Sequence, residues 1–211
     1  MSQYLTKTIL AYGDSNTWGE PPGGIGRYDR ESRWTGILEA LLGSGFHVVE
    51  EGLCGRTTAF DDVLTPNRNG LTYIPIALET HSPIQLLIIM LGTNDLNARF
   101  NLSPREIARG VEQLVLCAKN FRPSINHILL IAPPLVVPAD EKEIRDSFTG
   151  AIDKSKMLAA ELAKVADDNG CHFFDAASVA RSSPVDGVHL DAQEHAKLAQ
   201  GVCGVVRRLC W

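Results

Sequence analysis

Short apolar segments alternate with segments of helical periodicity along most of the chain. Five of the apolar segments are rich in Ile, Leu, Val or Phe and lack strict alternation with polar residues. Such a pattern is typical of strands that are covered on both faces. The segments are residues 8–12, 47–53, 84–91, 127–132 and 171–175. We therefore expect five buried strands.

Three stretches carry apolar residues at three- and four-residue spacing, which indicates helices with one buried face. Ser103, Pro104 and Glu106 mark a helix start, with Ser as the cap, Pro in the first turn and Glu three residues after the cap. A long helix is predicted over residues 143–168, and a final helix begins at Asp191. The apolar face of that final helix consists of Leu198, Ala199, Val202, Val206 and Leu209.

Strands that alternate with helices point to an α/β fold. We expect a three-layer α/β/α sandwich around a flavodoxin-like parallel sheet of five strands. A length of 211 residues fits one domain, so a single domain is expected over residues 1–211. Ligands of such sheets bind at the carboxyl ends of the strands. Residues 61–70 are expected to form a loop, and residues 20–33 and 133–148 are expected to shape the cleft.

Composition and charge narrow the classes of function. Hydrophobic residues make up 45% of the chain and charged residues 21%, as in an ordinary soluble globular protein. The net charge of −5 argues against a general nucleic-acid binder or a module that lies on a membrane surface. The longest apolar stretch, residues 86–91, is too short to cross a bilayer. Residues 1–7 lack the basic segment and apolar run of a signal peptide.

The cysteines argue against a disulfide framework or a zinc ribbon, because they are odd in number, irregularly spaced and without a Cys-x-x-Cys pair. They are Cys54, Cys117, Cys171, Cys203 and Cys210. Reduced thiols in a cytoplasmic protein are the simplest interpretation. No ligand spacing suggests a metal, and no nucleotide-binding pattern follows a strand. We therefore expect neither a metal nor a cofactor.

Polar residues with catalytic potential follow the expected strands. Ser15 ends a Gly-Asp-Ser motif after the first strand, and Asn94 lies in a Gly-Thr-Asn-Asp motif after the third. Near the end of the chain, Asp186 precedes His189 by three residues, so a carboxylate is available to a histidine base. Each motif alone also fits a helix cap, an Asx turn or a surface loop. One fixed three-residue pattern arises by chance about 0.03 times in this length, so the ordered set favours a shared catalytic role.

The motifs resemble the four blocks of the SGNH (GDSL) hydrolases, esterases named for Ser, Gly, Asn and His. The matching residues are Gly13, Asp14 and Ser15 in the first block, Gly55 or the competing Gly52 in the second, Gly92, Asn94 and Asp95 in the third, and Asp186 and His189 in the fourth. Asn16 stands where the family name has Leu, a departure expected to affect specificity. The resemblance spans residues 13–189. The motif sequences are most similar to those of bacterial arylesterase and acyltransferase members.

These parts make up a mechanism for acyl transfer. Ser15 would attack the ester carbonyl, His189 would take its proton, and Asp186 would orient the imidazole. The backbone N–H groups of Ser15 and Gly55 and the side-chain amide of Asn94 would form the oxyanion hole. The substrate pocket is expected to include Asn16, Trp18 and Val188. Cys54, beside the oxyanion turn, is expected to be a small buried residue rather than a rival nucleophile.

The expected function is a serine esterase for small carboxylic esters with short acyl or aryl groups, with acyltransferase or perhydrolase side activity. The same scaffold can host a carbohydrate O-deacetylase, a lysophospholipase or a thioesterase. An alternative of another class is a flavodoxin-like binding module without catalysis. The expected partner is a small-molecule ester, without nucleic acid or membrane. Assembly into a homo-oligomer is implied by the resemblance, since related arylesterases often assemble.

Overall fold

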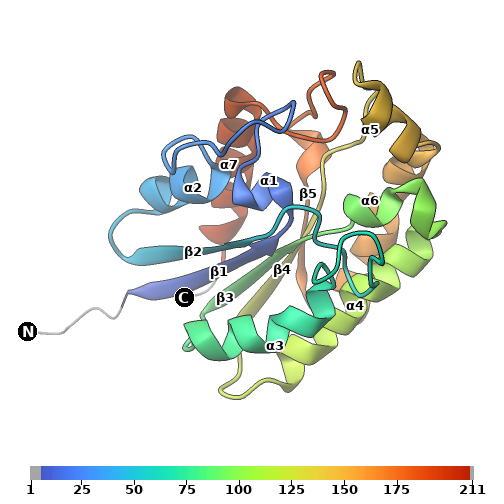
Figure 1. Ribbon diagram of the computed structural model, residues 1–211. Coiled ribbons are helices and arrows are strands. Elements are labelled where there is room, and N and C mark those ends of the chain that lie inside the picture. Colours follow the sequence, from blue (N-terminus) through green and yellow to red (C-terminus); the bar gives the residue numbers. More distant parts are fainter. Residues whose placement is uncertain (1–5, 210–211) are drawn as a thin grey trace, which may run out of the picture.

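Five parallel strands form one sheet in the order β2-β1-β3-β4-β5 (Figure 1). The strands are β1 (Lys7–Gly13), β2 (Phe46–Gly52), β3 (Leu86–Met90), β4 (His127–Ala132) and β5 (His172–Asp175). The structure is a computed structural model that describes residues 6–209. Residues 1–5 and Cys210, which entered the sequence interpretation, lie outside this range. The expected five-stranded parallel sheet is confirmed.

Helices cover both faces of the sheet, as expected for an α/β/α sandwich. The α-helices are α1 (Ser15–Trp18), α2 (Trp34–Leu42), α3 (Gly70–His81), α4 (Pro104–Asn120), α5 (Lys142–Ser147), α6 (Ala151–Asp168) and α7 (Ala192–Val206). Three short 3-10 helices are η1 (Asn94–Leu96), η2 (Ala98–Phe100) and η3 (Ala176–Ser178). Helices α2 and α7 pack together on one face, and α3, α4 and α6 lie on the other.

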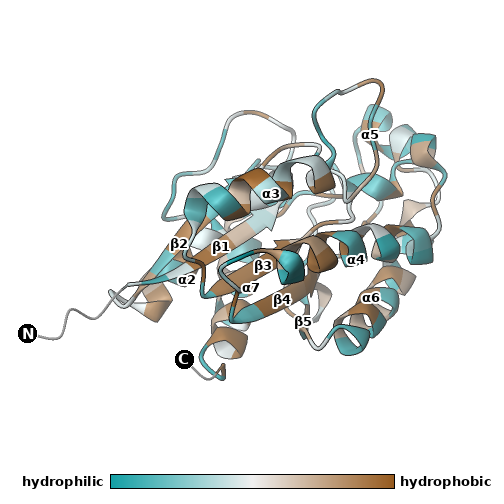
Figure 2. Cartoon of the chain, turned by 90° about the horizontal axis from the view of Figure 1, so that it is seen from below, coloured by the Kyte–Doolittle hydropathy of each residue, from teal (hydrophilic) through white to brown (hydrophobic). Residues whose placement is uncertain are grey.

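The hydrophobic core lies on both sides of the sheet because the central strands bury both of their faces. All five residues of β3 are buried. In Figure 2, β3 and β4 are coloured almost entirely as hydrophobic, whereas each helix carries hydrophobic and hydrophilic residues in turn. The near-continuous apolar runs in the sequence therefore reflect strands without a solvent face.

The predicted starts of two helices are confirmed by their caps. The Ser103 hydroxyl accepts a hydrogen bond from the Glu106 N–H, and the Glu106 carboxylate accepts from the Ser103 N–H, which makes a capping box at α4. The Asp191 carboxylate accepts from the N–H groups of Gln193 and Glu194 at α7. Both helices then bury the apolar face that their spacing predicted.

The prediction of one helix over residues 143–168 is wrong, because the chain forms α5 and α6 there. Gly150 separates the two helices in a left-handed conformation, with φ of +79°. Glycine adopts this conformation without steric cost, so it ends one helix and allows the next to start in a new direction. Helix α6 then buries Ala151, Leu158 and Leu162 against the sheet.

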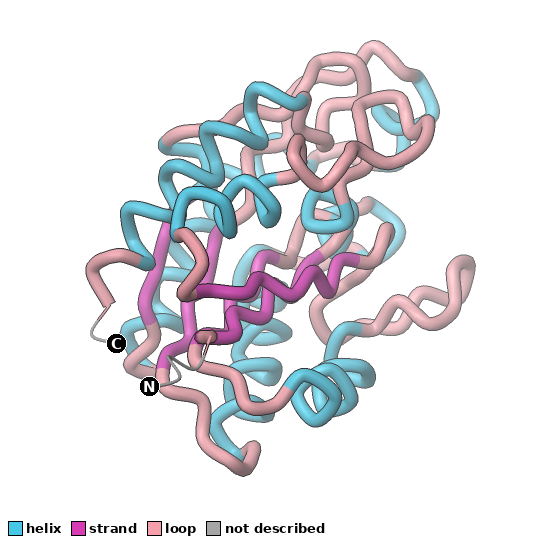
Figure 3. Tube along the Cα trace, turned by 90° about the vertical axis from the view of Figure 1, so that its left-hand side faces the viewer, coloured by secondary structure: helices cyan, strands magenta, loops and turns pink. Residues whose placement is uncertain are grey.

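The loops that follow the strands gather at one end of the sheet. Figure 3 shows these loops, in pink, clustered beyond the magenta strands. Residues 61–69 have no regular structure, as predicted, and α3 begins at Gly70. None of the helices formed by residues 6–209 has the length and apolar character needed to cross a bilayer.

Candidate active site

Ser15 lies at the first turn after β1. The Asp14 carboxylate accepts a hydrogen bond from the Asn16 N–H at 3.0 Å and caps α1, which starts at Ser15. A Cβ atom at Gly13 would stand 2.1 Å from Thr17 Oγ1, so this turn requires glycine at that position. Ser15 is only 6% exposed. Its hydroxyl therefore stands at the carboxyl end of a central strand, where a parallel sheet binds its ligands.

A hydrogen-bonded chain joins Ser15 to the loop before α7. His189 Nε2 lies 2.9 Å from Ser15 Oγ, and His189 Nδ1 lies 2.7 Å from Asp186 Oδ2. Serine and histidine are 174 residues apart in the sequence. The structure thus brings together the three residues that the sequence motifs placed in one mechanism, in the geometry of a nucleophile, its base and an orienting carboxylate.

Asp186 is held by backbone groups as well as by the imidazole. Its Oδ1 accepts from the N–H groups of Val188 and His189 at 3.1 Å and 3.0 Å, and its Oδ2 accepts from the Gly23 N–H at 2.9 Å. Gly187, in the same turn, has φ of +78°, and a Cβ there would lie 2.4 Å from the Val137 carbonyl oxygen. The turn that presents His189 is therefore fixed by backbone hydrogen bonds and a required glycine.

These contacts shift the pKa values of both residues. Burial alone would raise the pKa of Asp186, but the hydrogen bonds from His189 and the attraction of its imidazole bring that pKa well below the ordinary range. Burial alone would lower the pKa of His189, but Asp186 outweighs it, and Glu20 and Asp14 act in the same direction. The pKa of His189 is therefore raised, so its imidazole is a stronger base than an ordinary histidine.

Asn16 and Val188 differ from their expected place in the substrate pocket. Asn16 is 2% exposed, its Nδ2 donates to the Val188 carbonyl at 3.0 Å, and its Oδ1 accepts from the Leu190 N–H at 3.0 Å. The Val188 side chain packs in the core. The Asn16 amide forms these hydrogen bonds with backbone groups on both sides of His189. It therefore joins the turn that carries Ser15 to the loop that carries His189.

The two candidate glycines of the second block have different environments. Gly52 ends β2, and a Cβ there would lie 2.1 Å from the Trp18 backbone nitrogen, so this position allows α1 to pack against β2. Gly55 follows in a turn closed by the hydrogen bond from the Arg56 N–H to the Leu53 carbonyl, with φ of +77°. The close approach of α1 explains a glycine at 52, and the left-handed turn explains a glycine at 55.

Asn94 stands at the start of η1, directly after β3. Its Nδ2 donates to the Arg56 carbonyl at 3.0 Å, and the amide group has a second hydrogen that this bond does not use. Arg56 is itself buried, with Nη1 donating to the carbonyl oxygens of Gly13 and Glu51 and its guanidinium 4.1 Å from the centre of the Tyr12 ring. Arg56 therefore links the ends of β1 and β2 to Asn94.

Two buried carboxyl groups support these turns. Asp95 accepts from the Thr58 N–H at 3.0 Å and from the Thr58 hydroxyl at 2.6 Å, which fixes the loop after β2 to the loop after β3. Burial raises the pKa of Asp95 to about 6 and the pKa of Asp14 to about 6. The motifs located both residues, but their structural contacts depend on segments distant in sequence, which no local pattern reveals.

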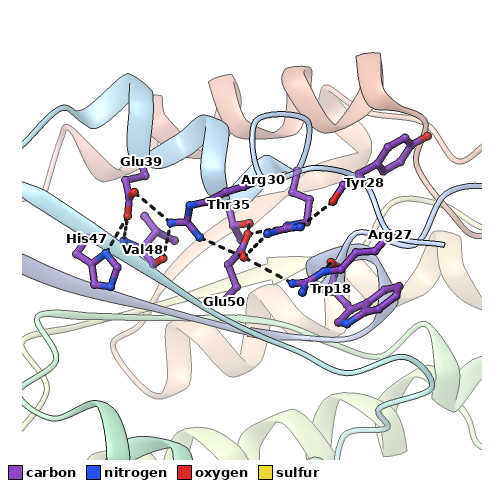
Figure 4. A network of polar contacts seen from close by, with 10 residues as sticks. Trp18, Arg27, Tyr28, Arg30, Thr35, Glu39, His47, Val48 and Glu50 are labelled. Atoms are coloured by element: carbon purple, nitrogen blue, oxygen red, sulfur yellow. Dashed lines mark hydrogen bonds and ion pairs between the residues drawn. The ribbon is translucent and has the colours of Figure 1, made fainter.

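The loop of residues 20–33 is anchored to the sheet edge by an ion-pair network (Figure 4). The Glu50 carboxylate, on β2, accepts two hydrogen bonds from Arg33 at 2.9 Å and 2.7 Å and lies 3.2 Å from Arg30 and 3.6 Å from Arg27. Thr35 donates to the same carboxylate. Three guanidinium groups on one nearly buried carboxylate hold this loop in place, so its active-site residues have fixed positions.

Two residues at the end of α1 and just after it lie close in sequence to Ser15. Trp18, expected in the substrate pocket, is half-buried and carries the Arg27 guanidinium 5.0 Å above its ring. Glu20 Oε2 lies 3.6 Å from His189 Nε2. Glu20 was missed by the sequence motifs because a charged residue in a Gly- and Pro-rich loop carries no periodic signal.

The remaining groups to consider are the Cys54 thiol and the side chains that could bind a metal ion. Cys54 is half-buried, and burial, with the Glu20 carboxylate as a second cause, raises the pKa of its thiol to about 12. A thiol with such a pKa is protonated at neutral pH and is a poor nucleophile. Within residues 6–209, no group of three or more His, Cys, Asp or Glu side chains is arranged to hold a metal ion.

The chain is similar to known proteins in sequence and in fold. The chain matches the GDSL-like Lipase/Acylhydrolase family over residues 11–197. A crystal structure of a carbohydrate acetylesterase family member from Sinorhizobium meliloti is 40% identical, with a TM-score of 0.92 over 95% of this chain and 97% of that chain. The native M. smegmatis aryl esterase is 37% identical, with a TM-score of 0.92 over 97% of this chain and 100% of that chain. No curated protein matches the chain. The family match and these identities show that the chain is a carboxylic ester hydrolase and belongs to the GDSL-like lipase/acylhydrolase family.

Proposed function

We propose that this esterase hydrolyses small carboxylic esters with short acyl groups through an acyl-enzyme on Ser15. The observation that carries the proposal is the chain of hydrogen bonds from Asp186 through His189 to the Ser15 hydroxyl. His189 takes the serine proton as Oγ attacks the ester carbonyl, and it returns that proton to the leaving alcohol. Asp186 holds the imidazole in the tautomer with hydrogen on Nδ1 and stabilises the imidazolium as it forms.

The oxyanion in this mechanism lies between the backbone N–H groups of Ser15 and Gly55 and the side-chain amide of Asn94. Within residues 6–209, neither backbone N–H has a hydrogen-bond acceptor, and the Asn94 amide keeps one hydrogen beyond its bond to Arg56. Donors that are already oriented stabilise developing charge without reorganisation, and each typically contributes about 3 kcal/mol. Gly55 is preferred to Gly52 because Gly52 is required where α1 packs against β2.

We favour short acyl groups because the reactive atoms have little exposure. Ser15 and His189 are both nearly buried, and the Arg27 guanidinium covers the ring of Trp18, three residues after Ser15. A cavity of about 100 Å³ is lined by Asp186 and by apolar residues such as Val136 and Phe148, but not by Ser15 or His189. Residues 133–148 thus contribute to this side of the site.

A second candidate is deacetylation of carbohydrates. It is favoured by the relatives from Sinorhizobium meliloti, which are described as carbohydrate acetylesterases. Both candidates use the same acyl-enzyme and differ only in the alcohol part of the ester. The ratio of kcat/KM for an acetylated sugar to kcat/KM for p-nitrophenyl acetate separates them.

The primary test is hydrolysis of p-nitrophenyl esters from acetate to decanoate by the wild type, Ser15→Ala and Ser44→Ala. Ser44 is an exposed serine outside the site, so its variant is a matched control. We expect activity that is highest on acetate or butyrate, is lost in Ser15→Ala and is kept in Ser44→Ala. Retained turnover in folded Ser15→Ala would refute the assignment of the nucleophile.

We also propose that the enzyme transfers acyl groups to alcohols or peroxide as a side activity. The same proposal includes a cytoplasmic location and assembly into a homo-oligomer. Assembly is supported by exposed apolar side chains on the loops after β1 and β2, which a second copy of the chain could cover. These side chains are Ile25, Val63 and Leu64. Light scattering coupled to size-exclusion chromatography tests the assembly, and a Val63→Ser, Leu64→Ser double variant tests its location.

A further inference from the structure

Glu20 is a second carboxylate at the reactive centre, beside Asp186. It follows Gly19, which ends α1 with φ of +92°, and its backbone N–H donates to the Ser15 carbonyl at 3.0 Å. Its side chain is 22% exposed, and Oε2 lies 3.6 Å from His189 Nε2. The carboxylate therefore lies next to the imidazole nitrogen that faces Ser15.

The contact between Glu20 and His189 is too long for a direct hydrogen bond, and His189 Nε2 already interacts with Ser15 Oγ at 2.9 Å. Within residues 6–209, the side-chain donor close to the Glu20 carboxylate is the Cys54 thiol, which is a weak donor. An ionised carboxylate has about four acceptor positions. The Glu20 carboxylate can therefore accept a further hydrogen bond from a molecule bound in the space next to His189.

Deacylation requires a molecule in that space. Once Ser15 Oγ carries the acyl group, His189 Nε2 must receive a proton from the acyl acceptor. A water molecule has two O–H groups, and hydrogen bonds of about 2.8 Å allow one water to reach two acceptors that are 3.6 Å apart. A simple alcohol has one O–H group and would place its apolar part against the carboxylate.

We propose that Glu20 accepts the second O–H of the deacylating water and so directs the acyl-enzyme toward hydrolysis and away from transfer to simple alcohols. This inference rests on the proposed acyl-enzyme mechanism. The water oxygen forms a bond to the acyl carbon, and one water proton passes to His189 Nε2. The bond from that carbon to Ser15 Oγ then breaks as His189 returns the proton to Oγ, which releases the carboxylic acid. Glu20 gains and loses no proton; it positions the water.

The test measures the ratio in which the acyl-enzyme reacts with an alcohol and with water. p-Nitrophenyl acetate is supplied with 1-propanol at a fixed concentration, and propyl acetate and acetic acid are quantified for each variant. Glu20→Leu removes the acceptor, and Glu20→Gln keeps one neutral acceptor oxygen. We expect Glu20→Leu to raise the ratio of transfer to hydrolysis by about tenfold, the effect of losing one hydrogen bond to a charged group. Glu20→Gln is expected to fall between Glu20→Leu and the wild type.

Glu31→Leu is the matched control, because Glu31 is an exposed carboxylate on the same loop. The product ratio does not depend on the fraction of enzyme that is folded, so a partly unfolded Glu20→Leu still reports it. Equal ratios in the wild type and both Glu20 variants would overturn the role of Glu20, as would an equal shift in Glu31→Leu. Release of p-nitrophenol with an unchanged ratio refutes only this inference, whereas absence of release from the wild type refutes the esterase mechanism with it.

Discussion

The side-chain amide of Asn16 donates a hydrogen bond to the carbonyl oxygen of Val188 at 3.0 Å, across 172 residues of sequence. The same amide accepts from the Leu190 N–H at 3.0 Å. Asn16 is therefore hydrogen-bonded to the backbone on both sides of His189. Its neighbour Ser15 faces the imidazole of that histidine. Together with the hydrogen bonds of Asp186, this buried side chain sets the position of His189 relative to Ser15.

Asn16→Ala is expected to weaken both stability and catalysis. The substitution leaves the buried Leu190 N–H without its partner, whereas the Val188 carbonyl keeps the Ser182 hydroxyl at 3.4 Å as a donor. We expect the free energy of unfolding in urea to fall by about 1–3 kcal/mol, the cost of one unsatisfied buried group. We also expect kcat to fall while KM changes little. Asn126→Ala, at an exposed position, is the control. A change of substrate preference without loss of stability would instead support the expected role in specificity.

Asn94→Ala removes one proposed donor to the oxyanion. Because this donor acts on charge that develops in the transition state, we expect kcat to fall by about 10²-fold, or about 3 kcal/mol, with little change in KM. The exposed Asn120, at the end of α4, provides Asn120→Ala as a control. The measurement is steady-state hydrolysis of p-nitrophenyl acetate. A variant with a higher KM and an unchanged kcat would show that Asn94 contributes to binding of the substrate in its ground state.

The pH dependence of kcat/KM is expected to report the raised pKa of His189. The base acts in its neutral form, so activity falls as the pH drops through the pKa of the folded enzyme. Because Asp186, with Glu20 and Asp14, holds this pKa above the ordinary value of 6.5, the acid limb should lie above pH 6.5. Asp186→Asn should lower both the activity and the midpoint of that limb. An inflection below pH 6.5 in the wild type would contradict the electrostatic account.

Asp14→Asn is expected to stabilise the fold at neutral pH. Burial raises the pKa of Asp14 to about 6 from 3.8, so the unfolded chain loses this proton at lower pH than the folded one. Stability therefore falls as the pH rises from about 4 to about 6, with a cost on the order of 3 kcal/mol above that window. Asparagine keeps the cap of α1 without the charge. Urea unfolding at pH 8 and pH 4 should show a gain of about 1–3 kcal/mol that shrinks in acid.

The control for this prediction is Asp29→Asn, a change of the same kind at an exposed loop position. It should leave the free energy of unfolding nearly unchanged at both pH values. A gain in Asp14→Asn that is as large at pH 4 as at pH 8 would assign the effect to packing, and no gain at pH 8 would refute a buried charge at this position.

The strands were predictable to within two residues because burial on both faces leaves a continuous apolar run, as in β4. Helices α2 and α3 were not recognised. Helix α3 contains Pro75, which interrupts any helical pattern, and it is held by tertiary packing of residues such as Ile74 and Leu78. The break at Gly150 was missed because glycine is also tolerated inside helices at a modest cost.

Part of the candidate site could be proposed from the sequence because Ser15 follows β1 closely and Asn94 follows β3, where a parallel sheet exposes side chains to a ligand. Ser15, Asn94 and His189 belong to short motifs that can be read locally. Asn16 and Glu20 are different. Their contacts with the histidine loop join residues that are distant in the sequence, so only the folded arrangement shows these contacts.

The ion-pair network around Glu50 also covers part of one edge of the sheet. Among residues 6–209, strand β2 pairs with β1 alone, and the outward N–H and carbonyl of Val48 would otherwise be open to a strand from another molecule. Glu39 accepts from that N–H at 2.6 Å and Arg30 donates to that carbonyl at 3.2 Å. A foreign strand would have to break the same ion pairs that hold the active-site loop. We therefore expect pairing through this edge to disturb the loop that holds Glu20.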